Sequence, residues 1–383
     1  MDVRRCCSGY GWSAAGHWCA VHRTVRYVRG ENETAVCPAG ESKMKVPSQL
    51  NESKSADAML TGLGVAVVIC TYDPERWPLL LAAVSSAFNQ ELPPLEVIIV
   101  VDHHRSLLER VRRELPCVTV AENAFQRGLP GGKNTGIAVA TAPIIAFLDD
   151  DAEASPDWLS RLVPNFLNPH VMGAGAAVHA TWVPQRPLWF PEEFDWVVGC
   201  SHLGLPTAKT PVRNVLGGAC VMRRELFTAV GGYRLGLGRV GKHPAGCEET
   251  ELCIRARQQL PNAFFVFEPE AIVRQQPPAD RCTFRYFRRR CFAEGSSKAL
   301  VREFVGARAA LSTEMTYVTR TLPKAICTGL WAGGTGDAWG FVRAGVVACG
   351  LIWTAAGYAL GRFLLWRERS PQTPAAAPAI TAA

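Results

Sequence analysis

The sequence predicts an α/β fold, in which a largely parallel sheet is covered by helices on both faces. Short apolar runs alternate with helix-like stretches, and these runs span residues 65–69, 97–101, 118–120 and 144–148. Wholly apolar strands of this length are typical of parallel strands that are buried on both faces. Polar clusters follow three of them, at residues 71–73, 102–104 and 149–151. Ligands of parallel sheets bind beyond the carboxyl ends of the strands, so we expect these loops to converge on one crevice.

The segments between and after these strands complete the expected fold. A polar turn over residues 71–76 leads into a helix, and a second helix follows Asp102. A glycine-rich loop precedes a helix that we expect to begin at Asn134. Beyond Pro156 the pattern is mixed, and a further helix is expected to start near Glu248.

The chain of 383 residues divides by composition into four segments. Residues 1–60 lack a sustained period and are expected to be disordered, as is the tail over residues 367–383. Residues 61–305 carry the α/β pattern, and residues 306–366 are expected to be helical. Within the helical region, residues 344–361 carry no charge. As a helix they would extend about 27 Å, which approaches the bilayer's hydrocarbon thickness of roughly 30 Å. This predicts a membrane-associated helix, and a single span is favoured over a buried or interfacial helix.

The charge distribution favours phosphate groups and an anionic membrane surface as partners. The net charge is +7, and basic residues gather near both ends and at Arg285, Arg288, Arg289 and Arg290. They are not interleaved with aromatic residues as in a nucleic-acid-binding module, so we expect no nucleic-acid partner. The 14 cysteines are scattered and several lie within apolar runs, which indicates a reducing, cytosolic environment.

Three adjacent carboxylates, Asp149, Asp150 and Asp151, stand where the fourth apolar strand ends. Like charges at this spacing repel one another, and a divalent cation shared with diphosphate oxygens would offset that repulsion. The alternative is a solvated acidic turn that caps the following helix.

Two further motifs carry chemistry. The glycine-rich loop over residues 128–134 includes Lys133 and runs into a helix, a geometry that directs backbone N–H groups at an anion. A tight turn explains the same loop equally well. Glu248 and Glu249 begin a helix, where carboxylates often serve only to complement the helix dipole. Beside a metal site, one of them would suit the general base of a sugar transfer.

In this order, the motifs resemble glycosyltransferase family 2, from about residue 65 to residue 301. The matching strings are Val-Val-Ile-Cys-Thr-Tyr-Asp (67–73), Glu-Val-Ile-Ile-Val-Val-Asp (96–102), Gly-Lys-Asn-Thr-Gly (132–136), Phe-Leu-Asp-Asp-Asp (147–151), Gly-Gly-Ala-Cys (217–220) and Glu-Glu-Thr-Glu-Leu-Cys (248–253). The resemblance implies the GT-A fold, a Rossmann-like mixed sheet that binds a nucleotide-diphosphate sugar, together with Mg²⁺ or Mn²⁺. A looser match over residues 290–298 resembles members that act on lipid-linked sugars, such as glucuronosyl transferases on polyprenyl carriers.

The resemblance also implies roles for individual residues. Its donor-binding positions fall on Thr71, Tyr72, Asp73, Asp102, Lys133, Asn134, Asp149, Asp150, Gly218, Ala219 and Arg290. Residues 71–73 would lie along the nucleoside, Asp102 would accept a hydrogen bond from the base, and Asp149 would sit near the ribose. Gly218 and Ala219 would approach the donor sugar.

The catalytic positions implied by the resemblance are Asp151 as metal ligand and Glu249 as general base. The family's Glu-Asp pair is Glu248-Glu249 here, and the extra methylene leaves Glu248 as an alternative base. Lys133 stands where the family usually has arginine, so a bidentate phosphate contact is not expected of it.

These features predict a metal-dependent, inverting transferase at the cytoplasmic face of the membrane. It would move a hexosyl or uronosyl group from a nucleotide-diphosphate donor to a lipid-linked or cell-surface glycan acceptor. A polyprenyl-phosphate sugar synthase is a second reading, in which the acceptor is already ionised and needs no base. A non-catalytic sugar-binding scaffold is a third, but binding alone requires neither Glu248 nor Glu249.

Overall fold

The computed structural model describes residues 63–241 and 243–369. The disorder expected for residues 1–60 and for nearly all of residues 367–383 concerns positions outside the described residues. The strands are β1 (Val65–Thr71), β2 (Glu96–Val101), β3 (Thr119–Glu122), β4 (Ile144–Asp149), β5 (Ala152–Ala154), β6 (Val171–Ala180), β7 (Thr210–Val212), β8 (Ala219–Arg223) and β9 (Phe264–Gln275).

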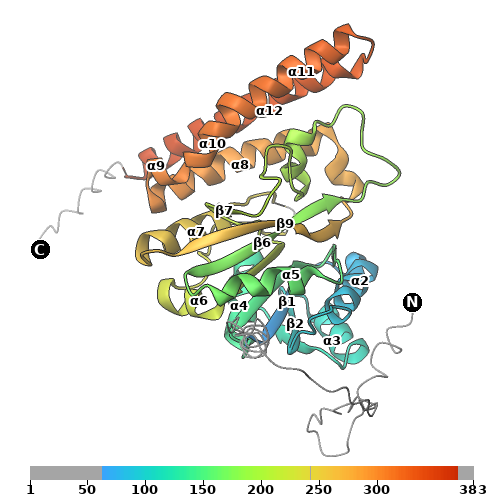
Figure 1. Ribbon diagram of the computed structural model, residues 1–383, viewed down its shortest axis with the longest axis vertical. Coiled ribbons are helices and arrows are strands. Elements are labelled where there is room, and N and C mark those ends of the chain that lie inside the picture. The colour runs from blue at the N-terminus through green and yellow to red at the C-terminus, as the bar shows by residue number, and fades with distance from the viewer. Residues whose placement is uncertain (1–62, 242, 370–383) are drawn as a thin grey trace, which may run out of the picture. The chain divides into compact units, whose positions relative to one another are not determined.

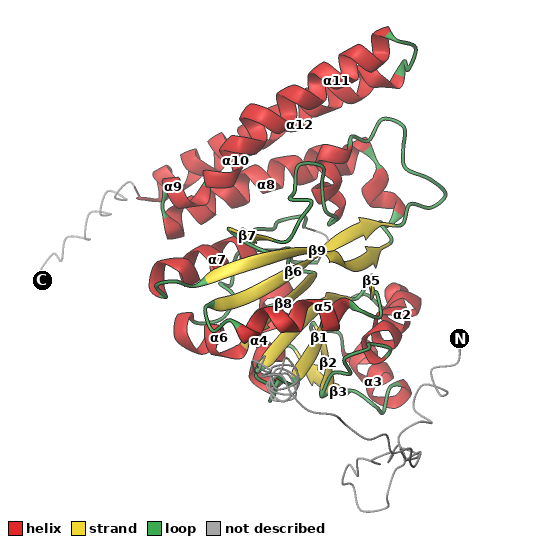
Figure 2. Cartoon of the chain, viewed as in Figure 1, coloured by secondary structure: helices red, strands yellow, loops and turns green. Residues whose placement is uncertain are grey.

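Helices cover both sides of these strands (Figure 2). The α-helices are α2 (Trp77–Phe88), α3 (Arg105–Glu114), α4 (Leu129–Val139), α5 (Trp158–Leu162), α6 (Arg224–Val230), α7 (Glu248–Gln259), α8 (Phe284–Val305), α9 (Ala307–Ala310), α10 (Ser312–Thr316), α11 (Leu322–Gly334) and α12 (Trp339–Arg369). Short 3-10 segments are η3 (Pro74–Arg76), η4 (Val163–Leu167), η5 (Glu192–Val198) and η6 (Ala279–Cys282), and η7 (Tyr317–Thr321) is a π-helical turn.

The described strands form one mixed sheet in the order β3-β2-β1-β4-β8-β6-β9-β5, with β7 paired to β9. The first four are parallel. The largely apolar sequences of β1, β2 and β4 fit burial on both faces, whereas the edge strand β3 is only half-buried or exposed. The register sets Thr71 opposite Val101 and Cys70 opposite Asp149, so three carboxyl ends reach the same edge. The predicted α/β fold is confirmed.

The second half of the sheet supplies the antiparallel pairs. Strand β8 runs antiparallel to both β4 and β6, while β6 and β9 are parallel. This gives the mixed sheet that the resemblance implies. Strand β9 ends at Gln275, opposite Ala152 of β5, so its end reaches the segment just after the three aspartates.

Helix α4 begins at Leu129, so the expected glycine-rich loop before Asn134 is wrong: it forms the first turns of the helix. The glycines serve close packing. A Cβ on Gly136 would lie 2.3 Å from Val68 Cγ1, and one on Gly132 would lie 3.1 Å from Cys70 Sγ. The helix can therefore approach β1 only without side chains at these positions.

The C-terminal helices form a hairpin, α11 and α12, which runs beside α8 (Figure 1). Helix α12 is longer than the uncharged stretch over residues 344–361 from which it was expected. Among the described residues, the segment Trp339–Glu368 alone is long and apolar enough to cross a membrane, with a mean hydropathy of 1.5.

Candidate active site

The ends of β1, β2 and β4 meet, as expected from the sequence. Thr71 Oγ1 donates a hydrogen bond of 2.7 Å to Asp150 Oδ2, and the backbone N–H of Asp102 donates to Thr71 O at 2.8 Å. The backbone N–H of Asp149 donates to Gly218 O at 3.2 Å, which brings the start of β8 to the same place.

Two members of the acid cluster (Asp149, Asp150 and Asp151) are buried, since Asp150 is 4% exposed and Asp151 is 5% exposed, and Asp149 is partly buried. Arg76 Nη1 lies 2.6 Å from Asp150 Oδ1, and its Nη2 lies 2.9 Å from Asp151 Oδ2. Gln275 Nε2 donates to Asp151 Oδ1 at 3.0 Å. The solvated, helix-capping turn considered from the sequence is therefore wrong.

Burial makes this cluster electrostatically strained. It raises the pKa of Asp150 to about 6, although Arg76 acts in the opposite direction. The pKa of Asp149 is also raised, by burial and by the charge of Asp151. For Arg76, burial lowers the pKa, but Asp151 and Asp150 outweigh burial and hold it above its usual range.

A second guanidinium, that of Arg281, approaches the cluster from η6. It lies 3.9 Å from Asp151 Oδ2, and the residue is only 7% exposed. Burial and the positive charge of Arg239 lower the pKa of Arg281. Cations held this close together in a buried place favour an anionic ligand.

The acid cluster suits a hard divalent cation in part. Asp151 Oδ2 is buried and accepts no aligned hydrogen bond, so its contact with Arg76 is an ion pair only. Among the described residues, no three His, Cys, Asp or Glu side chains are grouped so as to enclose a metal ion. Further ligands would have to come from diphosphate oxygens and water, which is how proteins commonly hold Mg²⁺.

The first turn of α7 carries the carboxylate pair. Glu249 Oε1 forms an ion pair with Lys133 Nζ, which also donates to Gly217 O at 3.3 Å. Lys133 is 2% exposed, and its Nζ lies over the rings of Tyr233 at 5.0 Å and Phe147 at 5.6 Å. The structure thus pairs Lys133 with Glu249, and a contact of Lys133 with donor phosphate stays a prediction.

Glu248 is 4% exposed, and its Oε2 is buried without a hydrogen bond. Burial, followed by the charge of Glu249, raises its pKa to about 7, while Lys133 acts in the opposite direction. A carboxyl group that titrates near neutral pH is suited to exchange protons with a substrate.

Two glycines connect the acid cluster to this pair. A Cβ on Gly217 would lie 1.7 Å from Glu249 Oε1, and one on Gly218 would lie 2.3 Å from Asp149 Oδ2. The main chain at residues 217–218 therefore fits directly between the two sets of carboxylates. Ala219 is fully buried and pairs with Leu148, so its methyl group packs within the sheet.

The polar residues that follow β1 and β2 mainly stabilise loops through hydrogen bonds. Asp102 accepts hydrogen bonds from Asn123 Nδ2 at 2.7 Å and from the backbone N–H of Gly128 at 2.9 Å. Asp73 caps η3 by accepting from the backbone N–H of Glu75 at 3.0 Å. The ring of Tyr72 lies 6.0 Å from the guanidinium of Arg76, beside the acid cluster.

Two expected donor-binding residues lie further from the acid cluster. The side-chain amide of Asn134 donates a hydrogen bond to Tyr233 O and accepts one from the backbone N–H of Tyr233, each at 2.8 Å. Arg290, on α8, donates to Glu294 at 2.8 Å and stacks over Trp196 at 5.3 Å. Its Nε is buried without a hydrogen bond, and its Nη2 would lie 2.8 Å from a Cβ on Gly246.

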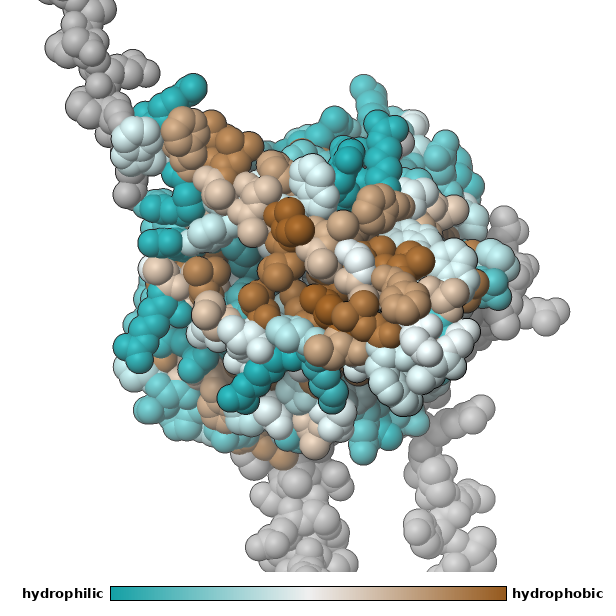
Figure 3. All heavy atoms as spheres, turned by 90° about the horizontal axis from the view of Figure 1, so that it is seen from above, coloured by the Kyte–Doolittle hydropathy of each residue, from teal (hydrophilic) through white to brown (hydrophobic). Residues whose placement is uncertain are grey.

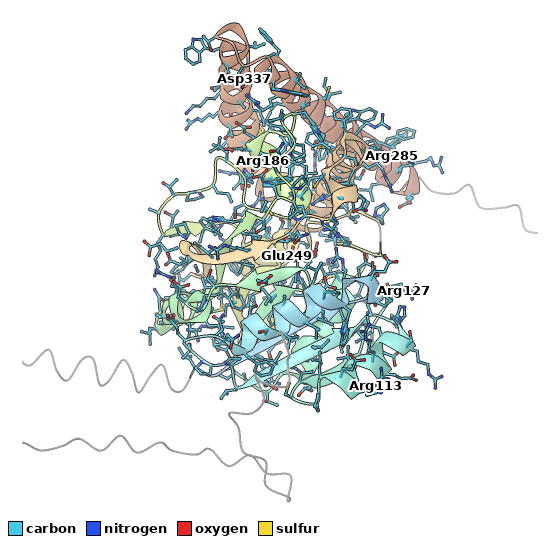
Figure 4. All side chains as sticks on the ribbon, turned by 90° about the vertical axis from the view of Figure 1, so that its right-hand side faces the viewer. Arg113, Arg127, Arg186, Glu249, Arg285 and Asp337 are labelled. Carbon is cyan, nitrogen blue, oxygen red and sulfur yellow. The ribbon has the colours of Figure 1, made fainter. Side chains whose placement is uncertain are left out.

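Sequence reasoning missed Arg76, Gln275 and Arg281, although all three contact the acid cluster. Arg76 is the last residue of the polar turn expected over residues 71–76, which is the one signal that pointed to it. Nothing local distinguishes Gln275 or Arg281, because only the sheet order brings the end of β9 to β5. In Figure 4, Glu249 lies near the middle of the molecule, whereas Arg127 and Arg285 lie toward its right-hand side.

Comparison with known proteins gives consistent matches. A family model described as "Glycosyl transferase family 2" matches residues 66–231. The glucosyl-dolichyl phosphate glucuronosyltransferase of Haloferax volcanii is 34% identical over 241 residues, 62% of this chain and 77% of that protein. Succinoglycan biosynthesis protein ExoM of Rhizobium meliloti is 25% identical over 241 residues, 61% of this chain and 74% of that protein.

Among solved structures, the mannosyltransferase PcManGT from Pyrobaculum calidifontis, in complex with GDP-Man and Mn²⁺, gives a TM-score of 0.49 at 16% identity. That match covers 80% of this chain and 94% of the other. The family model spans the sheet from β1 to β8 and ends before Glu248.

Proposed function

The chain belongs to glycosyltransferase family 2, and from this premise we propose that it inverts the anomeric centre of a nucleotide-diphosphate sugar in a metal-dependent transfer. The observation that carries the proposal is the fit of residues 217–218 between the acid cluster and the carboxylate pair. Donor charge and acceptor proton would thus be handled at neighbouring places, as a single displacement requires.

The donor would bind along the carboxyl ends of the parallel strands. Tyr72 would lie beside the nucleoside, Asp102 would accept a hydrogen bond from the base, and Asp149 would sit near the ribose. Asp102 has spare capacity for this, because each carboxylate oxygen has two lone pairs and each accepts one protein hydrogen bond in the contacts described above.

Asp151 would hold Mg²⁺ or Mn²⁺ through its buried Oδ2, with the donor's diphosphate as co-ligand. When bound, the ion would offset negative charge on the diphosphate as it departs. Arg76 would exchange its ion pair with Asp151 for one with the diphosphate, and Arg281 lies close enough to join it. Both guanidiniums favour a phosphate oxyanion as partner.

Glu249 would act as the general base. The acceptor oxygen attacks the anomeric carbon, its proton passes to Glu249, and the bond from that carbon to the diphosphate oxygen breaks with the electron pair leaving on the nucleoside diphosphate. Lys133 holds the carboxylate in place through its ion pair. Glu248, whose Oε2 is unpartnered, is the alternative base.

For the acceptor, we favour a lipid-linked glycan at the cytoplasmic face of the membrane. The Haloferax volcanii relative is named for transfer of a glucuronosyl group to a glucosyl-dolichyl phosphate, which is a sugar already attached to a lipid phosphate. A sugar hydroxyl of this kind must lose its proton, which is consistent with the presence of Glu248 and Glu249.

The test uses purified full-length protein, a panel of nucleotide sugars, Mn²⁺ and polyprenyl-linked glycans, with products identified by mass spectrometry. We expect one donor to be transferred, and transfer to disappear after chelation of the metal. Absence of both transfer and donor hydrolysis across the panel would contradict the proposal. Activity on polyprenyl phosphate that survives Glu249→Gln and Glu248→Gln would favour the synthase instead.

Calorimetry distinguishes a non-catalytic scaffold from a transferase. A transferase of the proposed kind should bind its donor far more tightly with Mn²⁺ than without it, whereas a scaffold should bind the donor independently of metal. Glu109→Gln, which alters a side chain that is 58% exposed on α3, is the matched control for the folding of Glu249→Gln and Glu248→Gln.

A further inference from the structure

The hairpin of α11 and α12 exposes large apolar side chains. Trp331 is 71% exposed, Ile352 64%, Trp366 62%, and Phe341 and Phe363 52% each. The face seen from above in Figure 3 carries a broad apolar area over this part of the chain. Contiguous apolar surface of this kind marks a site of interaction with another molecule or with a membrane.

The opposite side of α12 is fixed to the catalytic domain. A Cβ on Gly295 of α8 would lie 1.9 Å from Thr354 O, and a Cβ on Gly357 of α12 would lie 2.0 Å from Phe292 O. A Cβ on Gly350 would lie 2.5 Å from the ring of Phe194. Backbone therefore meets backbone along the middle of α12, and no lipid fits between α12 and α8.

Charged side chains of α8 form a hydrogen bond and an ion pair with the same stretch of α12. Arg302 Nη1 donates to Tyr358 OH at 2.7 Å, and Arg362 Nη1 lies 2.8 Å from Glu303 Oε2. If α12 crossed a bilayer in this arrangement, Arg302 and Glu303 would enter the hydrocarbon with it. Charged groups are costly there, so the packing opposes a spanning orientation.

The composition of the exposed side favours lipid over a second protein. Tryptophans stand near both ends of the hairpin, at Trp331 and Trp366, and tryptophan rings concentrate at the boundary between headgroups and acyl chains. Residues 306–369 contain seven basic and three acidic residues, and Arg320, Lys324 and Arg367 are exposed. This charge complements an anionic leaflet.

We propose that the hairpin of α11 and α12 lies in the plane of one leaflet of an anionic bilayer and docks the catalytic domain there without crossing it. Docking does not depend on sugar transfer. Helix α8, which packs against α12, also contacts Gly246 and Cys247 through Arg290 and Glu294, just before Glu248. The hairpin and the loop that leads to the carboxylate pair thus contact the same helix.

Vesicle flotation tests whether the exposed apolar side of the hairpin binds lipid. Wild-type protein should float with vesicles of phosphatidylcholine and phosphatidylglycerol, and less with phosphatidylcholine alone. Trp331→Glu and Ile352→Glu should each lower the partition coefficient about tenfold, because each removes a large apolar side chain from the contact. Leu95→Glu is the matched control, since Leu95 is also 71% exposed but precedes β2. Unchanged thermal stability and donor binding in all variants would show that the catalytic domain is intact.

Wild-type protein that fails to float, or variants that float like wild type, would overturn the proposal. So would a change from dimer to monomer in the variants, because the apolar face would then cover a second copy.

Protease protection tests the orientation. One epitope tag is inserted in the turn before Trp339 and another after Ala383, and protease is added to sealed vesicles. Digestion of both tags from the side that exposes the catalytic domain is expected for an in-plane hairpin. Protection of either tag would show that α12 spans the membrane.

Discussion

The ion pair between Lys133 and Glu249 gives the sharpest prediction, because both partners are largely withdrawn from solvent. The side chain of Lys133 is 2% exposed and that of Glu249 is 13% exposed. Burial lowers the pKa of Lys133, but Glu249 and Glu248 outweigh burial and hold it above the usual range, so the ammonium group keeps its proton. Lys133→Met removes the charge and keeps most of the side-chain length.

Removing one partner of a buried pair costs about 3–5 kcal/mol, because the other charge is left buried and unpaired. Here the side chain of Glu249 retains some solvent contact, so we expect the lower end, about 3 kcal/mol. For a folded region of this size, with an unfolding entropy of about 2.1 cal/mol/K per residue, that corresponds to a melting temperature lower by about 5 °C.

The assay is a double-mutant cycle with Lys133→Met, Glu249→Gln and the two combined. The stability of each variant is measured by thermal unfolding at neutral pH. The double variant should be more stable than the sum of the single losses predicts, by at least about 2 kcal/mol. Arg105→Met is the control, since its exposed pair with Glu109 should change stability by less than about 1 kcal/mol. Additive losses, or a cost no larger than in the control, would refute the reasoning.

Three further predictions concern the site and the fold. Burial and the charge of Glu249 raise the pKa of Glu248, the alternative base, to about 7, so transfer that uses this residue as base should increase as the pH rises through about 7, and Glu248→Gln should remove that rise; a rate profile over pH measures this. Burial raises the pKa of Glu314 on α10, but its ion pairs with Lys298 and Arg213 outweigh burial and lower the pKa to about 2. The stability that this carboxylate adds above its ordinary pKa of 4.5 should be lost as the pH falls toward 2, and Glu314→Gln should flatten that loss in urea titrations. Gly218→Ala, whose methyl group would lie 2.3 Å from Asp149 Oδ2, should abolish donor binding in calorimetry, whereas Gly345→Ala, with open space around it, should not.

The sequence was sufficient for the parallel strands and the acid cluster because burial leaves a local pattern. An apolar run that ends in Asp149 specifies both a strand and the edge at which its carboxylates emerge. The packing of α4 was harder to predict. Glycines that permit close approach to β1 look the same in sequence as glycines that form a loop.

The partners of the acid cluster left no such pattern. Arg76 and Gln275 reach Asp151 from distant parts of the chain, and the contact of Gln275 depends on a sheet in which β9 neighbours β5. A side-chain contact of this kind is set by tertiary geometry, so neither periodicity nor motif spacing reports it.

Helix α8 shows why the catalytic region and the hairpin cannot be treated as separable parts. On one side Glu294 accepts a hydrogen bond from Cys247 Sγ, within the loop that leads to Glu248. One residue further along α8, Gly295 meets the main chain of α12 at a distance that leaves no room for a methyl group. Close-packed contacts transmit displacement because they cannot be compressed. A shift of α12 relative to the sheet would therefore move α8 and the loop before Glu248 with it, so the hairpin's attachment also constrains the position of the carboxylate pair.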